Sequence, residues 1–267
     1  MREDKIFEMI KSNPIVIKNI ENPSDEMKLM AIGKDGIMLR YIKNPTNKMN
    51  NLAIESNALA IEFVEEPTYD MKKYVVSKLW NTLEFIENPP EELIRIGINQ
   101  KGYAIKYSTK PSIELQKLAI KKDYDSIKYI EDPIEEMQFL AITKNYDALR
   151  YIKNATLNAE ILAISENEAA IKFVENLDEN KKILFLKCNA LVMKYFINDL
   201  PIDDVELAFK EVLSKETVTD KYVRNFINCD SINEKHGNIS MDKIVFIYRY
   251  GSKVCKKIAV DEKLNMM

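Results

Sequence analysis

A period of 22 residues runs through most of this sequence and constrains the fold more than any other feature. Written in rows of 22, residues 1–198 give nine rows without an insertion or a deletion, from row 1 at Met1 to row 9 at Leu177. Two columns are apolar in every row. The tenth position reads Ile10, Ile32, Ile54, Val76, Ile98, Ile120, Ile142, Ile164 and Leu186. The seventeenth reads Ile17, Leu39, Ile61, Leu83, Ile105, Ile127, Leu149, Ile171 and Met193. Such repetition is typical of an array in which each unit packs only on its neighbours.

The apolar spacing within each row predicts two helices. Positions 5, 8 and 9 follow the i, i+3, i+4 rule, as Met137, Leu140 and Ala141 show in row 7. Positions 16, 17 and 20 give a second stripe, which includes Leu149 and Ile152 in the same row. We call the two segments helix A and helix B. At about 8 to 11 residues each, they are too short to persist alone in water, so stacking of neighbouring rows is obligatory.

Polar residues mark where both helices begin. Seven rows carry Asn or Asp at position 13, where the side chain can cap helix B; Leu79 and Lys101 are the exceptions. At the row boundaries, sequences such as Asn22-Pro23-Ser24 leave two caps open for helix A. Either Asn caps the helix with Pro at its first position, or the following Ser or Thr caps it. The seven residues at position 13 are Asn13, Asp35, Asn57, Asp123, Asn145, Asn167 and Asn189.

These patterns predict an all-α fold, an α-solenoid of nine 22-residue helix-turn-helix repeats over 1–198 with a C-terminal capping region over 199–267. In the capping region, Pro201 to Leu213 reads as a helix. The tail 242–260 is rich in β-branched and aromatic residues around Gly251-Ser252, which predicts either a small β-hairpin or a final helix pair.

Composition and motifs argue against several classes of function. The formal charge of −3 does not favour general coating of nucleic acid or anionic membrane. The charged start of the chain and the lack of a long apolar run predict a cytoplasmic protein with no membrane span. Cys188, Cys229 and Cys255 have neither disulfide nor metal-ligand spacing, and His236 lies in a polar stretch without catalytic neighbours. We therefore expect no enzyme, cofactor, metal or small-molecule substrate.

The variable positions of helix B give the predicted partner site. Positions 14, 18 and 21 would form one outward stripe at α-helical spacing, with large aromatic residues beside charged ones, a pattern of binding hot spots. The stripe could instead be an ordinary solvated face. We predict that it contacts another protein, and that nucleic acid along the basic run of rows 5 to 9 is the alternative. The predicted contact residues are Trp80, Tyr124, Tyr146, Lys106, Lys128, Arg150, Lys153, Lys172, Glu62 and Glu84.

Row 5 departs most from the pattern. It has Gly97 where other rows have Ala, Gly102 at the start of helix B, and Ser108 in place of a core aliphatic residue. Glycine inside a helix costs about 1 kcal/mol relative to alanine. The sequence therefore predicts a weak or bent joint over 97–110.

Copies such as 22–32, NPSDEMKLMAI, and 132–142, DPIEEMQFLAI, resemble a short two-helix repeat of unknown function that recurs in proteins of low-GC bacteria and their phages. Rows 1, 8 and 9 lack its proline. The resemblance implies no reaction, cofactor or catalytic residue. It favours a phage or mobile-element protein that binds, and inhibits or scaffolds, a host protein complex.

Overall fold

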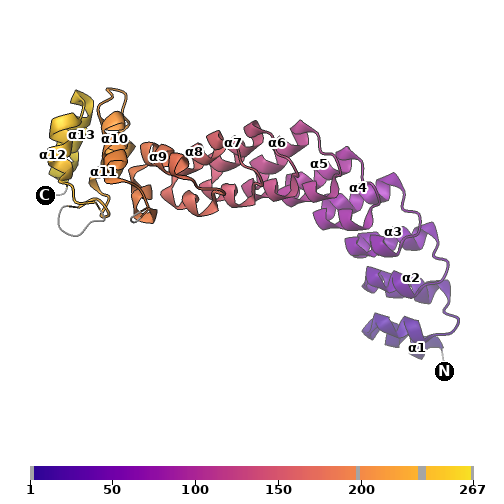
Figure 1. Cartoon of the computed structure of the whole chain (residues 1–267). Helices are drawn as coiled ribbons and strands as arrows, with labels where there is room; N and C mark the ends of the chain where they lie inside the picture. The colour runs from indigo at the N-terminus through magenta and orange to yellow at the C-terminus, as the bar shows by residue number, and fades with distance from the viewer. Residues whose placement is uncertain (1–2, 197–198, 234–238, 266–267) are drawn as a thin grey trace. The chain divides into compact units, whose positions relative to one another are not determined.

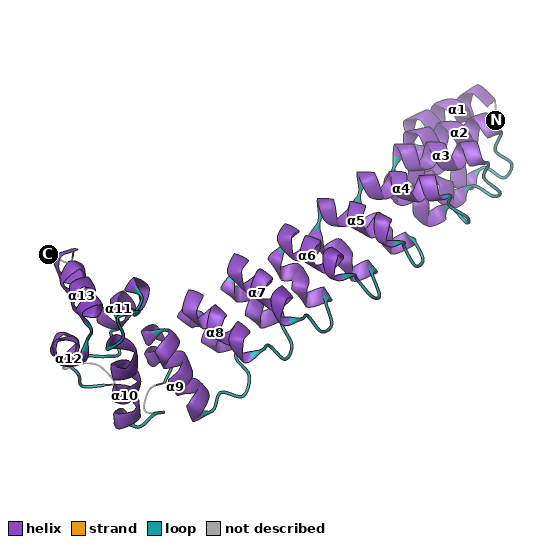
Figure 2. Cartoon of the chain, turned by 90° about the horizontal axis from the view of Figure 1, so that it is seen from above, coloured by secondary structure: helices purple, strands orange, loops and turns teal. Residues whose placement is uncertain are grey.

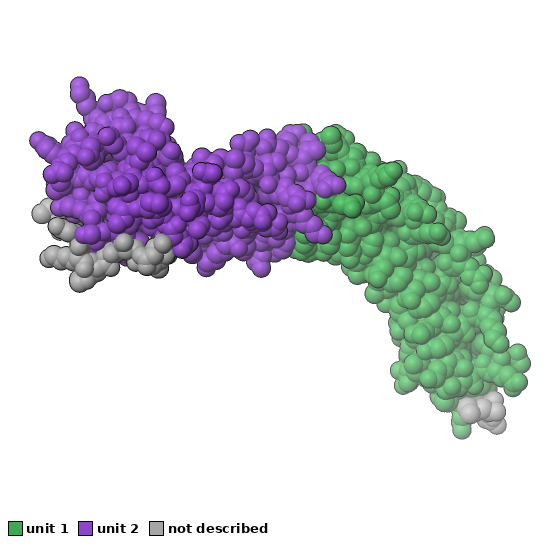
Figure 3. Space-filling view, viewed as in Figure 1, with its two compact units in different colours: residues 1–131 green, residues 132–267 purple. Residues whose placement is uncertain are grey.

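The computed structural model describes residues 3–196, 199–233 and 239–265, and these form an all-α repeat solenoid (Figure 1). Within that part of the chain, β pairing is confined to one isolated bridge between Ile232 and Ile239. The chain divides into two compact units, unit 1 over 1–131 and unit 2 over 132–267 (Figure 3). This division falls between rows 6 and 7, so rows 7 to 9 share a unit with the capping region. The separation of repeats from cap at 198/199 stays a prediction.

Every row contains a ten-residue α-helix, as the sequence predicts for helix A. In unit 1 these helices are α1 (Glu3–Ser12), α2 (Asp25–Lys34), α3 (Asn47–Ser56), α4 (Tyr69–Lys78), α5 (Glu91–Gln100) and α6 (Ile113–Lys122). In unit 2 they are α7 (Glu135–Lys144), α8 (Leu157–Glu166) and α9 (Glu179–Cys188). Within a unit, consecutive α-helices pack side by side (Figures 1 and 2).

Helix B is shorter and more tightly wound than predicted. It is a six-residue 3₁₀ helix at positions 14 to 19, and position 20 is already extended in rows 1 to 8. The i→i+3 bonds of a 3₁₀ helix satisfy more backbone groups of so short a segment than i→i+4 bonds would. The nine are η1 (Pro14–Asn19), η2 (Gly36–Tyr41), η3 (Ala58–Phe63), η4 (Trp80–Phe85), η5 (Gly102–Tyr107), η6 (Tyr124–Tyr129), η7 (Tyr146–Tyr151), η8 (Glu168–Phe173) and η9 (Ala190–Tyr195).

The Ser and Thr residues after the row boundary, rather than the Asn before it, cap helix A. In row 2, for example, Ser24 Oγ accepts a hydrogen bond from the Met27 amide at 3.3 Å. Asn instead turns the chain at four row ends, where its φ lies between 46° and 55°. Asn tolerates this left-handed conformation better than most residues do. The four are Asn44, Asn88, Asn154 and Asn176.

Side chains at position 13 cap the 3₁₀ helices in six of the seven rows where a cap was predicted. Asp123 is the exception, because its carboxylate accepts from the Gly102 amide at 2.7 Å and from Lys101 Nζ at 3.0 Å in the row before. Row 4, which has Leu79 at position 13, is capped in a similar way: Gln100 Oε1 accepts from the Trp80 amide at 3.0 Å. Rows 4 and 5, which have Leu79 and Lys101 at position 13, therefore take a cap from the following row.

The core of each unit consists of the side chains in the apolar columns of the repeat. Positions 10 and 17 are buried in all nine rows. Row 5 keeps this pattern. Its two glycines have no room for a side chain, because a Cβ added to Gly97 would lie 2.7 Å from Leu83 Cδ1, and one added to Gly102 would lie 2.6 Å from the Ala119 carbonyl oxygen. Both glycines thus allow a close approach to a neighbouring row. The predicted weakness of this row stays a prediction.

The tail 242–260, where a hairpin or a helix pair was predicted, forms two helices, so the hairpin is wrong and its alternative, a helix pair, is right. The C-terminal region contains α10 (Ile202–Leu213), α11 (Asp220–Ile227), α12 (Lys243–Tyr250) and α13 (Lys253–Asn265). Gly251 has a φ of −68°, which is not the left-handed value that a II′ turn needs. Its amide bonds to the Ile247 carbonyl and ends α12, and Ser252 Oγ accepts from the Cys255 amide and begins α13.

The first two helices of this region act as a tenth repeat. α10 packs beside α9, and α11 packs against η9. Arg224 on α11 then fixes α13, because its guanidinium bonds to Asp220, to Asp261 at 2.8 Å and to Glu262. α13 therefore has a defined position at the end of the stack.

Candidate protein-binding surfaces

The predicted stripe of positions 14, 18 and 21 does not lie on one face of helix B. A 3₁₀ helix repeats every three residues, so position 14 aligns with the buried position 17, and position 18 aligns with position 15. Position 21 lies beyond the helix end. The stripe was derived from α-helical spacing, and the tighter helix separates its members. Whether the ten residues contact a partner stays a prediction.

In unit 1, the predicted residues of row 4 and its neighbours are only partly available. Trp80 is half-buried; its ring centroid lies 6.4 Å from that of Tyr107, and Lys106 Nζ lies 5.7 Å from the Trp80 ring. Glu62 and Glu84 are exposed. The aromatic anchor of this region is therefore already covered by neighbouring side chains.

A polar cluster in rows 5 and 6 engages Lys128. Its Nζ lies 3.3 Å from Asp125 Oδ2 and 4.2 Å from the Tyr103 ring, while the Tyr103 hydroxyl donates to Asp125. That hydrogen bond raises the pKa of Tyr103. Burial would raise the pKa of the Asp125 carboxyl, but hydrogen bonds from Tyr103 and Lys128 outweigh it and hold that pKa below its ordinary value. Tyr124, the predicted aromatic of row 6, is half-buried at the start of η6.

In unit 2, the predicted cations also meet partners within the chain. Arg150 Nη1 lies 3.3 Å from Asp147 Oδ2, and its guanidinium lies 5.3 Å from the Tyr151 ring and 5.5 Å from the Phe173 ring. Lys172 Nζ lies 5.7 Å from the Tyr195 ring. Tyr146 is half-buried, and Lys153 is exposed beyond the end of η7.

The helix A surfaces, which the sequence reading did not single out, differ at positions 4 and 7 between rows 4 and 5 of unit 1 and the rows of unit 2. In rows 4 and 5 of unit 1, a cation at position 7 pairs with an acid at position 4 of the next row. Lys73 Nζ lies 2.8 Å from Glu92 Oε1, and Arg95 Nη2 lies 3.3 Å from Glu114 Oε2. The Tyr69 hydroxyl also donates to Glu92, at 2.5 Å. Polar bridges thus cross from helix to helix on this surface.

From position 7 of row 7 onward, unit 2 has apolar or uncharged residues at these positions. Position 7 holds Phe139, Ile161 and Ile183, all half-buried, and position 4 of the following rows holds Asn158 and Asn180. We call this surface the unit 2 A-face. It comprises Phe139, Leu140, Leu157, Asn158, Ile161, Leu162, Asn180, Ile183, Leu184 and Leu207. Leu157 and Leu207 are its most exposed apolar side chains, at 44% and 54%.

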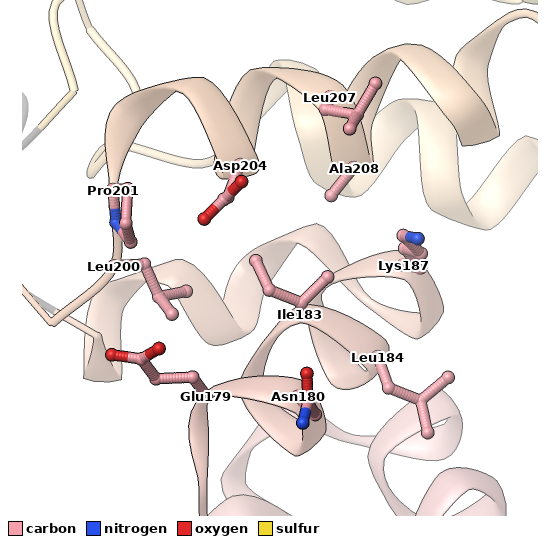
Figure 4. A pocket seen from close by; sticks show the side chains of 10 residues that line it. All are labelled: Glu179, Asn180, Ile183, Leu184, Lys187, Leu200, Pro201, Asp204, Leu207 and Ala208. Atoms are coloured by element: carbon pink, nitrogen blue, oxygen red, sulfur yellow. The ribbon is translucent and has the colours of Figure 1, made fainter.

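The A-face ends in a groove between α9 and α10 (Figure 4). The groove has a volume of about 400 Å³. Ile183 and Leu184 line it from α9, and Leu207 and Ala208 from α10. Lys187 lies at one end, 2.5 Å from Glu211. Glu179, Asn180 and Asp204 also line it, so the groove could receive an apolar side chain of a partner beside polar groups.

A signal for the A-face is present in the sequence. Column 7 changes from polar to apolar between row 6 and row 7, and acids leave column 4 one row later. A comparison of columns across rows would have found the surface, whereas the aromatic and charged residues of helix B drew attention first. Column 7 reads Phe7, Leu29, Asn51, Lys73, Arg95, Lys117, Phe139, Ile161 and Ile183.

The described residues give little support for chemistry. No group of three or more His, Cys, Asp or Glu among them is placed to hold a metal ion. The three cysteines are free thiols, and burial raises their pKa values, that of Cys255 to about 11. His236 lies outside the described residues. The search of those residues for a helix long and apolar enough to cross a membrane also found none.

Comparisons with known proteins leave these surfaces as the main guide to function. No family model, curated protein or solved structure matches the chain.

Proposed function

We propose that this chain is a non-enzymatic protein-binding solenoid and that its partner contacts the unit 2 A-face. One observation carries the proposal. Apolar side chains occupy equivalent outer positions on α7, α8 and α9 and continue onto α10, where rows 4 and 5 have ion pairs. A contiguous apolar surface rimmed by polar residues is typical of a protein interaction site.

The scaffold suits this role because the exposed apolar residues are not needed for stacking. Positions 10 and 17 already fill the core, and Leu157 and Leu207 lie outside it. A partner could bury these residues without any rearrangement of the rows. Exchange of apolar for polar residues on an exposed face is also tolerated by the fold, as rows 4 to 6 demonstrate.

The resemblance of the repeats to those of low-GC bacterial and phage proteins directs the search for the partner. We propose a cytoplasmic host protein complex, which this chain inhibits or scaffolds. No cofactor is required for such a role.

Nucleic acid is the second candidate, and the cation and ring contacts of helix B favour it. Arg150 lies between the rings of Tyr151 and Phe173, an arrangement that can extend to a stacked base. Two ion pairs argue against nucleic acid, because Asp147 and Asp125 neutralise the charges of Arg150 and Lys128. Binding of single- or double-stranded RNA or DNA that weakens steeply with salt would favour this candidate, and no gel shift at low salt would remove it.

Affinity capture from a low-GC bacterial lysate, with quantitative mass spectrometry, tests the protein-binding proposal with three forms of the chain. They are the wild type, an A-face variant (Ile161→Lys with Asn180→Glu) and a helix B variant (Trp80→Ala, Tyr124→Ala and Tyr146→Ala). We expect the A-face variant to lose a protein that the wild type and the helix B variant retain. If the A-face variant retained the protein and the helix B variant lost it, the binding site would be assigned to helix B. Equal retention by all three would reject both surfaces.

A further inference from the structure

The terminal helix pair, α12 and α13, has an outer face that differs from the rest of unit 2. Tyr248, Val260 and Leu264 are exposed by 77%, 62% and 66%. Exposure at this level means that no described element packs over these three side chains. They therefore form an apolar face that stacking within the described part of the chain does not use.

The exposed residues surround a preformed groove. It has a volume of about 310 Å³ and lies between the two helices, with Ile247 and Ala259 buried at its floor and Tyr248, Val260 and Leu264 on its walls. Its shape is a channel between helices, which fits a ridge of side chains at helical spacing.

Contacts on the inner side hold the groove in shape. Arg224 on α11 bonds to Asp261 and Glu262 of α13. The Glu216 carboxylate accepts from the Lys253 and Val254 amides at the start of the same helix, at 3.2 and 3.3 Å. A groove that exists before binding costs less ordering free energy when it is filled.

The charge of this pair indicates what the groove accepts. The segment 243–265 has six basic and two acidic side chains, a formal charge of +4, whereas the whole chain has −3. Both acids are engaged by Arg224 on the inner side. Lys256 and Lys263 line the groove, and neither has a carboxylate partner among the described residues. The outer surface is thus apolar and basic.

We propose that the groove between α12 and α13 binds an amphipathic helix of a partner protein, with an apolar ridge in the channel and acidic residues against Lys256 and Lys263. A second copy of this groove is a poor occupant, because it would set these lysines against their own equivalents. A flat anionic membrane would leave the floor of the channel unfilled. The site uses other helices than the A-face and does not depend on the proposed function.

The test uses the full chain and two fluorescent peptides of about 18 residues, designed as helices with Leu at i, i+3, i+4 and i+7. One peptide has Glu on both sides of the Leu ridge, and the other has Lys at the same places. We expect the acidic peptide to bind about tenfold more tightly than the basic one, measured by fluorescence anisotropy at low salt.

Two variants identify the groove. Tyr248→Ala with Leu264→Ala should weaken the acidic peptide about tenfold or more. Lys256→Glu with Lys263→Glu should reverse the preference between the peptides. Because both lysines are exposed, this variant should fold, and it keeps the test valid if the Tyr248→Ala with Leu264→Ala variant unfolds. Leu157→Ala with Leu207→Ala, on the A-face, is the matched control and should leave peptide affinity unchanged.

Several outcomes would overturn the proposal. They are equal affinity for the two peptides, peptide affinity unchanged in both groove variants, or loss of peptide binding only in the A-face control. Binding of phosphatidylserine vesicles without peptide binding would assign the face to a membrane instead. Self-association of the chain that is lost in the groove variants would assign it to a second copy.

Discussion

Rows 4 and 5 of unit 1 and rows 7 to 9 of unit 2 have the same backbone and the same buried columns but opposite outer surfaces on helix A. In unit 1, Lys73 and Arg95 reach acids of the next row. In unit 2, Ile161 and Ile183 occupy the position of those cations, and asparagines replace the acids. The comparison separates what the repeat requires from what it leaves free. The core columns specify stacking, while positions 4 and 7 decide whether a row presents a charged surface or an apolar one.

The largest effect should come from giving unit 2 the surface of unit 1. Ile161→Lys with Asn180→Glu places a cation and an acid where rows 4 and 5 have their pair. We expect partner affinity to fall about 100-fold, because an interface core is lost, and the free energy of unfolding to change by only about 1 kcal/mol. Calorimetric titration with the captured partner and urea denaturation measure the two quantities. A loss of binding that simply followed unfolding would contradict the prediction.

A smaller effect should come from the capping side chains, which also differ between rows 4 and 5 and rows 7 to 9. Rows 7 to 9 have their own caps, whereas row 4 depends on Gln100, whose Nε2 also donates to the Val76 carbonyl at 2.5 Å. We expect Gln100→Ala to lower the free energy of unfolding by about 1 to 2 kcal/mol. Asn167→Ala, which removes a cap within one row, is the control, at about 1 kcal/mol. Gln100→Ala should in addition speed amide exchange in both rows 4 and 5; an effect limited to one row would argue against a shared cap.

The same exchange experiment tests row 5 in the wild type. The glycines and Ser108 predict that amides over 97–110 exchange faster than their equivalents in row 7. Equal protection of the two rows would show that the close packing around Gly97 and Gly102 offsets the missing side chains.

The reverse exchange should produce a modest change in unit 1. Lys73→Ile with Glu92→Asn removes one polar bridge and gives row 4 the pattern of row 8. We expect more binding of a hydrophobic dye such as ANS and little change in melting temperature, because the bridge is exposed. Lys78→Ile, on the same helix but outside the bridge, is the control for the added apolar residue. Equal dye binding by the two variants would mean that the pair does not protect the surface.

The smallest effect is a pH dependence that comes from the Glu92 pair of unit 1. Hydrogen bonds from Lys73 and then from Tyr69 lower the pKa of Glu92 below its ordinary value of 4.5. A carboxyl with a lowered pKa contributes stability above its unfolded pKa and loses it as pH falls through the folded value. Glu92→Gln should therefore lower the melting temperature slightly at pH 7 and not at pH 3. A difference that persisted at pH 3 would mean that the pair is not its source.

Much of the fold follows from the spacing of apolar and capping residues. The period, helix A and six caps at position 13 could be predicted from the sequence, because each depends on residues that are close together in the chain. The winding of helix B could not be predicted, since apolar residues at positions 16, 17 and 20 suit both i+3 and i+4 spacing. Asp123 was misassigned because a cap can serve the next row as well as its own, and only the structure shows which amide it meets.

The candidate site could not be predicted as well from the sequence, for a physical reason. Trp80 and Arg150 have the residue types of a binding surface, yet the tighter helix and the neighbouring rows engage both. The A-face consists mostly of apolar residues, which within one row resemble core residues. Only their contrast with Lys73 and Arg95 distinguishes them from core residues.

Photo-crosslinking at two matched positions tests the central claim most directly. Leu157 and Tyr69 hold position 3 of rows 8 and 4 and have nearly equal exposure, 44% and 43%. A photoreactive amino acid would replace each in turn, and adducts would be identified by mass spectrometry after irradiation in a low-GC bacterial host. We predict an adduct with the captured protein from position 157 and none from position 69. An adduct from position 69 alone, or capture of the protein without any adduct from position 157, would contradict the account.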